Sequence, residues 1–314
     1  MITIITTREF SPNFFYETGL DMDDVTLVIS GKSQSVFGHR MNQDFDRKIY
    51  KKTEIFDLKK ILKIVKGKEV GMDFANENVK FYSEIRKSAK KVIDISEDYL
   101  VKRSFKKEDE ARLIRAASKK AKDIIFGLDI RKGMAEIEIA KALKKEVIDQ
   151  GLELSFEPIV ASGINSSYPH SVPGSRRIGP FVMIDFGVKY NHYCSDITEV
   201  VFLDKKAREF GLYGKIKDAF GMILDDLENC DNGNDVHLSY LNAFKRLGLP
   251  KMPHSIGHGV GLDVHEYPRL KKVSKDRIRG TVFTLEPAVY YRNRFGLRFE
   301  RDIFVNKSGK VEVF

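Results

Sequence analysis

Carboxylates interrupt two pairs of apolar segments in the second half of the chain. The segment "PFVMIDFGVKYNHYCSDITEVVF" carries Asp185 and Asp196 on either side of a polar centre, and "TVFTLEPAVYYRNRFGLRFERDIFV" carries Glu286 and Glu300 in the same way. Apolar runs on both sides of a polar centre predict β-hairpins. A carboxylate inside an apolar strand is costly when it lacks a partner, so each pair is a candidate for binding a cation.

The first hairpin is predicted to turn at Tyr190–Asn191. This register places Asp185 directly opposite Asp196, with Cβ atoms about 5 Å apart. Two like charges at that distance repel each other unless a cation or a proton lies between them. The alternation of side chains along the strand turns Thr198 toward the same face and Glu199 toward the other.

The second hairpin repeats the arrangement with two glutamates. A turn centred on Asn293 places Glu286 opposite Glu300, and Pro287 predicts a bulge or an edge at that point. Four carboxylates with one imidazole would suit two divalent cations about 3.5–4 Å apart. The mixed oxygen and nitrogen set favours Mn, Co, Fe or Zn over copper or a thiolate site. The alternative, surface acids on edge strands, accounts for one pair more readily than for both.

The segment "PHSIGHGVGLDVHEYP" holds His254, His258 and His265. The four-residue spacing of the first two matches a zinc-binding helix, but such a helix needs H-E-x-x-H, and here Ser255 follows His254. Glycines at positions 257, 259 and 261 also oppose a helix. We expect backbone that packs closely against a neighbour, with His258 as the metal-binding imidazole.

The remaining chain supplies the elements that must hold these residues. In the first 100 residues, predicted strands at 25–30, 69–74 and 91–96 alternate with helices at 56–67 and 77–89, which is typical of a small α/β unit. Further helices are predicted at 106–127, 134–151, 205–229 and 235–247, the last with Asn234 or Asp235 as its cap and Gly248 as its stop. A charged stretch at 97–106 is the predicted boundary between domains 1–100 and 101–314.

Composition limits the class of protein. The 314 residues include two cysteines, Cys194 and Cys230, too few for a disulfide scaffold or a cysteine-rich zinc cluster. The net charge is +9, but the lysines are interleaved with acids and no nucleic-acid-binding motif accompanies them. No apolar run approaches the ~18 residues of a membrane helix, and the first residues lack the pattern of a signal peptide. We therefore expect a soluble cytoplasmic protein that binds neither membranes nor nucleic acid.

The hairpins and the histidine segment together resemble the pita-bread metallopeptidases, the family of methionine aminopeptidases, prolidases and aminopeptidase P. The family's ligands follow the order Asp, Asp, His, Glu, Glu. The matching residues are Asp185 in "MIDFG", Asp196 in "SDITEV", His258 in "IGHGVGLDVHEYP", Glu286 in "TLEPAVY" and Glu300 in "LRFERD". The first 100 residues, with "PNFFYETGL", resemble the N-terminal domain of the prolidase and creatinase-like branch. The implied fold class is α/β (α+β), with a small creatinase-like α/β domain before a pita-bread domain whose curved antiparallel sheet is flanked by helices.

The resemblance also implies roles for the ligands. Asp196 and Glu300 would bridge two divalent metal ions, Asp185 would complete one site, and His258 with Glu286 would complete the other. A hydroxide between the metals would be the nucleophile, and Glu286 the proton shuttle.

Four further residues receive roles from the same resemblance. His254 and His265 would bond to the scissile carbonyl or the tetrahedral intermediate. The segment "FEPIVASGINSSYPH" brings His170 near the leaving group, and Arg298 would support the site or meet the substrate carboxylate.

The implied activity is hydrolysis of an Xaa–Pro dipeptide by a homodimeric enzyme. Removal of the N-terminal residue from longer Xaa–Pro peptides, as by aminopeptidase P, is an alternative that the motifs do not separate. A non-catalytic binding protein is the third reading, and RNA is the partner that the basic charge would favour. Many prolidases read D-I-T-R-T after the second aspartate, whereas this chain has Glu199 in place of the arginine, which leaves substrate preference open.

Overall fold

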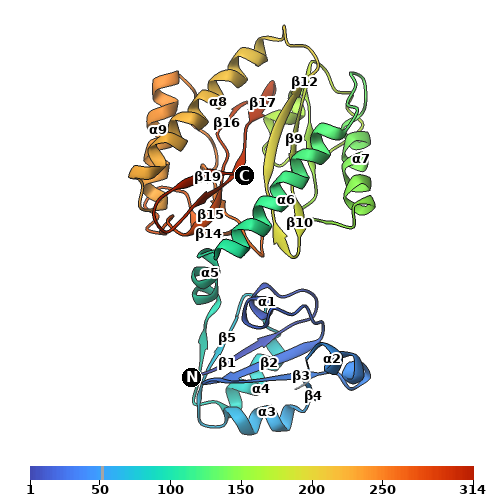
Figure 1. Ribbon diagram of the computed structural model, residues 1–314, viewed down its shortest axis with the longest axis vertical. Coiled ribbons are helices and arrows are strands. Elements are labelled where there is room, and N and C mark those ends of the chain that lie inside the picture. Colours follow the sequence, from blue (N-terminus) through green and yellow to red (C-terminus); the bar gives the residue numbers. More distant parts are fainter. Residues whose placement is uncertain (51–52) are drawn as a thin grey trace. The chain divides into compact units, whose positions relative to one another are not determined.

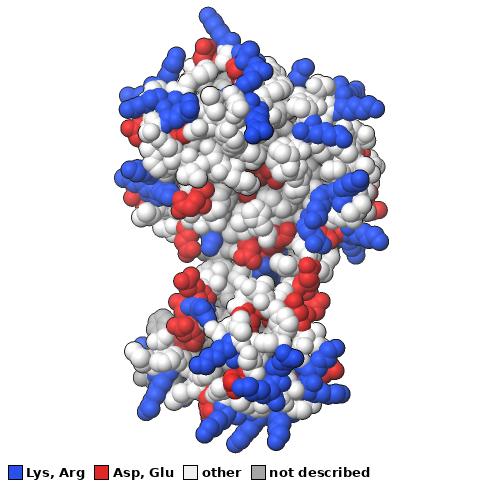
Figure 2. Space-filling model, turned by 180° about the vertical axis from the view of Figure 1, so that it is seen from behind, with Lys and Arg blue, Asp and Glu red and all other residues white. Residues whose placement is uncertain are grey.

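The computed structural model describes residues 1–50 and 53–314, and they form two compact units, Met1–Lys102 and Arg103–Phe314 (Figure 1). We propose that these units are the two predicted domains. Among the described residues, no helix combines the length and the apolar character needed to cross a bilayer. Figure 2 shows Lys and Arg side chains spread over the visible face of each unit, with Asp and Glu side chains among them.

The first unit is a six-stranded mixed sheet with helices around it. Its strand order is β4-β3-β2-β1-β5-β6, and the pairs β1–β5, β5–β6 and β3–β4 are parallel. The strands are β1 Ile2–Thr6, β2 Val25–Ser30, β3 Ser33–Gly38, β4 Thr53–Ile55, β5 Glu69–Met72 and β6 Lys91–Asp94. The helices are α1 Pro12–Thr18, α2 Gln43–Ile49, α3 Leu58–Val65, α4 Val79–Ser88 and α5 Ser96–Ser104, with a 3₁₀ turn at Arg40–Asn42. The predicted strands and helices of this region are confirmed.

The second unit combines four antiparallel sheets with four long helices. The helices are α6 Glu108–Gly127, α7 Glu136–Asp149, α8 Arg208–Asp226 and α9 Gly233–Leu247, with 3₁₀ turns at Gly163–Ser167 and Leu227–Asn229. One group of strands is β7 Glu153–Leu154, β8 Ile159–Ala161, β9 Phe181–Phe186, β10 Val188–Tyr190, β11 Tyr193–Cys194 and β12 Ile197–Phe202. The other is β13 His258–Gly259, β14 Glu266–Arg269, β15 Thr281–Leu285, β16 Ala288–Tyr291, β17 Phe295–Arg298, β18 Arg301–Val305 and β19 Val311–Val313.

The helices follow the apolar stripes that the sequence predicts. In α6, three acids occupy the first turn, where the helix dipole favours negative charge, and Ile114, Ala117 and Ala121 are buried. The stop of α9 at Gly248 is confirmed, because this glycine has a left-handed φ of 66°. The predicted cap of α9 is wrong: the side chain of Asn232, not that of Asn234 or Asp235, accepts the first backbone N–H groups.

Two cores hold the sheets of the second unit in place. Helices α6 and α7 pack on β8, β9 and β12, whereas α8 and α9 pack on the strands from β15 to β18 (Figure 1). The sheets are thus covered by helices on their outer faces, which leaves their opposite faces to meet each other. The two predicted hairpins lie at this meeting point.

Candidate metal centre

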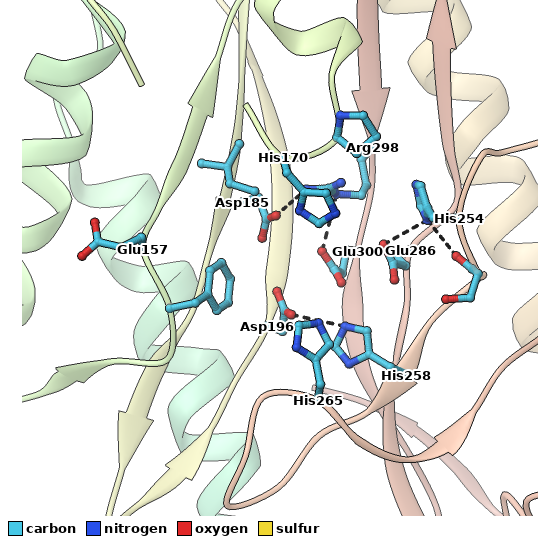
Figure 3. Close-up of a pocket in the computed structure, with 14 residues that line it drawn as sticks. Glu157, His170, Asp185, Asp196, His254, His258, His265, Glu286, Arg298 and Glu300 are labelled. Carbon is cyan, nitrogen blue, oxygen red and sulfur yellow. Dashed lines mark hydrogen bonds and ion pairs between the residues drawn. The ribbon is translucent and has the colours of Figure 1, made fainter. Parts of the chain in front are cut away.

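Nine residues were predicted to form a site, and all nine line one pocket of about 470 Å³ (Figure 3). The five candidate ligands come from strands or strand ends that are far apart in sequence. Asp185 lies in β9, Asp196 directly before β12, His258 in β13, Glu286 directly after β15 and Glu300 directly before β18. His170, His254, His265 and Arg298 complete the set.

The register of the first hairpin differs from the prediction. Thr198, not Asp196, lies opposite Asp185, because the turn falls at Asn191–His192, where both residues have positive φ. The ladder is therefore shifted by two residues, and the expected direct opposition of the aspartates is wrong. A two-residue shift preserves the face to which side chains point, so Asp185 and Asp196 still enter the same pocket.

The register of the second hairpin is confirmed. The pairs Ala288–Arg298 and Leu285–Arg301 continue a single register in which Glu286 would oppose Glu300, and the ladder breaks beside Pro287 as predicted. An isolated bridge between Thr198 and Glu300 then joins the two hairpins, with backbone N–O distances of 3.4 and 3.2 Å. This bridge brings the two carboxylate pairs together.

Three of the candidate ligands surround a common space. Asp196, His258 and Glu300 each offer a donor atom, and these atoms lie within 4.8 Å of one another. The Nε2 atom of His258 is 3.6 Å from an Asp196 oxygen. Among the described residues, Oδ1 of Asp185 and Oδ1 of Asp196 are buried without a hydrogen-bond partner. Buried polar atoms rarely remain unpartnered, so the donor set fits a divalent cation.

Burial dominates the protonation of the carboxyls. It raises the pKa of Asp185, Asp196 and Glu300, and the negative charges of nearby carboxyls raise those of Asp196 and Glu300 further. Burial also raises the pKa of Glu286 to about 8, with the Arg298 guanidinium opposing the rise. Without a cation these carboxyl groups are difficult to ionise. A bound cation would stabilise their charged forms.

The histidines show the opposite trend. Burial lowers the pKa of His258 to about 3 and that of His254 to about 4, so both imidazoles are neutral at pH 7. The Nδ1 atom of His258 lies 3.1 Å from the Gly259 carbonyl, to which it donates. This bond leaves the Nε2 lone pair facing Asp196, as a metal-binding imidazole requires.

Arg298 organises the carboxylates from the back of the pocket. Its side chain donates to Asp185, donates from Nε to the Thr198 hydroxyl at 2.9 Å, and donates from Nη1 to the Tyr290 hydroxyl at 2.9 Å. The Thr198 hydroxyl in turn donates to Glu300 at 2.5 Å. These bonds orient one carboxylate of each hairpin.

Two residues of this network, Tyr290 and Asp302, were not predicted from the sequence. The hydroxyl of Tyr290 lies 3.1 Å from Nε2 of His254 and links it to Arg298. Asp302 accepts the backbone N–H of Asp196 at 3.2 Å. Even spacing in the sequence is the signal that could have found both, since Tyr290 follows Glu286 by four residues and Asp302 follows Glu300 by two.

The glycines beside His258 allow the close backbone packing that was predicted. A Cβ atom at Gly257 would lie 2.0 Å from the Thr284 carbonyl oxygen, and one at Gly259 would lie 2.0 Å from that of Tyr267. The segment forms β13 instead of a helix, so the zinc-helix reading is excluded.

Two ion pairs, one of them fully buried, fix the loop that carries His265. Lys106, whose side chain is 1% exposed, donates to the fully buried Glu266 at 2.9 Å, and Arg103 donates to Asp263 at 2.7 Å. The rings of His265 and His258 lie 4.2 Å apart, centre to centre. The start of the second unit therefore anchors one wall of the pocket.

The arrangement matches a known family. The family model described as "Metallopeptidase family M24" matches residues 112–307. The chain belongs to metallopeptidase family M24. It is a metal-dependent peptidase by family, and the expected prolidase branch and pita-bread fold are confirmed.

Named relatives of this M24 peptidase include prolidases. It is 28% identical to the "Xaa-Pro dipeptidase" of Pyrococcus horikoshii over 95% of this chain and 89% of that one. The crystal structure of the prolidase from Pyrococcus horikoshii OT3 matches with a TM-score of 0.86 at 26% identity, covering 99% of this chain and 92% of that one. An X-Pro aminopeptidase from Thermotoga maritima shares the fold, with a TM-score of 0.87 at 24% identity over 99% and 95% of the two chains.

The one departure from the prolidase pattern lies outside the pocket. In this M24 peptidase, Glu199 forms an ion pair with Arg301 and accepts a hydrogen bond from Tyr213, on the strand face opposite Thr198. The prediction that Glu199 points away from the ligands is therefore confirmed. Its charge is balanced locally by the arginine.

Proposed function

We propose that this M24 peptidase hydrolyses the bond between an N-terminal residue and a following proline, acting as an Xaa–Pro dipeptidase with two divalent cations. The observation that carries the proposal is the convergence of four buried carboxylates and His258 in one pocket. Similarity to a named Xaa-Pro dipeptidase over nearly the whole chain supports the choice of substrate.

Five residues of the pocket are the proposed metal ligands. Asp185, Asp196, His258, Glu286 and Glu300 would hold the cations with their oxygen and nitrogen atoms. Cations of this kind (Mn, Co, Fe or Zn) would lower the pKa of a bound water molecule and so supply the nucleophile at neutral pH.

The remaining side chains act on the peptide. Glu286 receives the proton of the attacking water and returns it to the leaving amine. We assign His254 and His265 to the scissile carbonyl and to the tetrahedral intermediate, and His170 to the leaving group. Arg298 keeps the ligand carboxylates oriented through Asp185 and Thr198.

The test combines metal analysis with peptide hydrolysis. The purified protein, supplied with Mn²⁺ or Co²⁺, should cleave Xaa–Pro dipeptides. Asp196→Ala should lose bound metal and activity together, while Asp225→Ala, a change of an exposed acid on α8, should lose neither. Metal-loaded protein that cleaves no Xaa–Pro substrate would refute the proposal.

The length of the substrate is the point on which a second candidate differs. Cleavage of longer Xaa–Pro peptides is favoured by one observation, a hollow that adjoins the pocket beyond His170. A purely non-catalytic role is disfavoured because all five candidate ligands are present and line one pocket. The homodimer and the cytoplasmic location stay predictions from the sequence.

A further inference from the structure

A second hollow, of about 370 Å³, adjoins the metal pocket. The two cavities share Glu157, Ile159 and His170 as lining residues, so they have walls in common. In Figure 3, Glu157 lies at the opposite side of the view from His254, with the metal-binding side chains between them. The hollow therefore extends the pocket on the side of Glu157, away from His254.

The hollow has an apolar lining. Helix α7 contributes Ile137 and Ala140, and the segment after His170 contributes Val172 and Pro173. Val172 is 83% exposed and Ile137 is 37% exposed, so part of this apolar surface faces solvent. Covering such surface with an apolar group is favourable.

The charged residues of the hollow neutralise each other. Lys144 on α7 forms an ion pair with Glu157 at the rim, and both side chains reach solvent. Since this pair carries no net charge, it gives the hollow no preference for an acidic or a basic group. The lining thus selects for an uncharged, apolar side chain.

A buried carboxylate fixes the wall of the hollow. Glu136, which is fully buried, accepts hydrogen bonds from the backbone N–H of Ser162 at 2.9 Å, the side-chain amide of Asn165 at 2.8 Å and the backbone N–H of Gly174 at 3.3 Å. These bonds hold the chain on both sides of the segment that carries His170 and Val172. A wall held in this way is already formed before a ligand binds, which lowers the entropy cost of binding.

We propose that the hollow receives an apolar residue that follows proline in the substrate. The inference rests on the proposed Xaa–Pro cleavage. In such a substrate the first residue is the N-terminus, so the chain can continue only beyond the proline. The enzyme would then cleave Xaa–Pro–Yaa peptides with an apolar third residue, in addition to dipeptides.

The test compares three peptides, Leu-Pro, Leu-Pro-Leu and Leu-Pro-Asp, with the metal-loaded protein. We expect kcat/KM for Leu-Pro-Leu to exceed that for Leu-Pro-Asp by about tenfold, the range in which a hydrophobic pocket discriminates. Val172→Asp should lower the ratio of Leu-Pro-Leu to Leu-Pro cleavage by about tenfold. The matched control is Val273→Asp, because Val273 is 78% exposed and does not belong to the lining of either cavity.

Three results would overturn the inference: cleavage of the dipeptide alone, equal cleavage of the two tripeptides, or an unchanged ratio in Val172→Asp. A different result would refute the proposed function itself, namely no cleavage of any of the three peptides with metal bound. Cleavage of Leu-Pro therefore shows that the catalytic site works, and a negative result with the tripeptides then counts against the hollow alone.

Discussion

Metal binding should release protons from carboxyl groups, not from histidines. Burial raises the pKa of Glu286 to about 8, so in the metal-free protein this side chain is mostly protonated at pH 7. The pKa values of Asp196 and Glu300 are raised as well. His258, with a pKa lowered to about 3, is already neutral and has no proton to lose. A cation that needs ionised ligands must displace the carboxyl protons.

The same shift predicts how the stability of the metal-free protein depends on pH. The folded protein keeps the Glu286 proton up to a pKa of about 8, whereas an unfolded chain releases it at its ordinary value of 4.5. The unfolded state therefore binds fewer protons in this window, and the free energy of unfolding falls as pH rises from 4.5 to 8. At about 1.36 kcal/mol per pH unit, the decrease across this window is on the order of a few kcal/mol. Bound metal should abolish this decrease in the free energy of unfolding.

Calorimetry measures the proton release directly. Titration of Mn²⁺ into chelator-treated protein at pH 7, in buffers of different ionisation enthalpy, gives the number of protons as the slope of the observed heat against that enthalpy. We expect about one proton or more, and Glu286→Gln should lower the number. A slope near zero while metal binds, or no change in the variant, would refute the reasoning.

Three further substitutions test other parts of the site. His254→Ala should keep bound metal and lower kcat by about 10²–10³-fold, the usual effect of losing a contact to the transition state; an unchanged kcat would remove its role. Thr198→Val should weaken metal affinity by about 10–100-fold in chelator competition, because Glu300 loses the hydroxyl that orients it; wild-type affinity would contradict this. Lys106→Met should destabilise the metal-loaded protein by about 1–3 kcal/mol in denaturant titration, since Glu266 would lose its ammonium partner and keep only Arg103, whose Nη2 lies 3.3 Å from Oε1 of Glu266; a loss below about 0.5 kcal/mol would show that the Lys106 pair is dispensable.

The hairpins show what the sequence can and cannot specify. The alternation of apolar and polar residues determines which face of a strand is buried, so the four carboxylates could be assigned to one pocket. It does not distinguish registers that differ by two residues. The turn at Asn191–His192 was missed because the pair Tyr190–Asn191 satisfied the hydrophobic pattern equally well. The local signal for the observed turn is the tolerance of Asn and His for the positive φ that both residues adopt.

The support of the site depends on contacts between distant segments. The bridge between Thr198 and Glu300 links residues about a hundred positions apart, and no local pattern predicts it. The role of Glu136 is similar: in sequence it is one of two acids in the first turn of a helix, a position that the helix dipole explains. Only the folded chain shows that its carboxylate holds the segment before β9.

The glycines beside His258 place a limit on laboratory evolution of this enzyme. Any side chain at Gly257 or Gly259 would overlap a backbone carbonyl of the neighbouring strand, and backbone cannot move aside as a flexible side chain can. A saturation library at these codons should therefore return glycine almost alone, although neither residue offers a side chain to metal or peptide. Variants with altered metal preference should instead carry changes at other positions of the pocket, because these two glycines leave no room for a side chain.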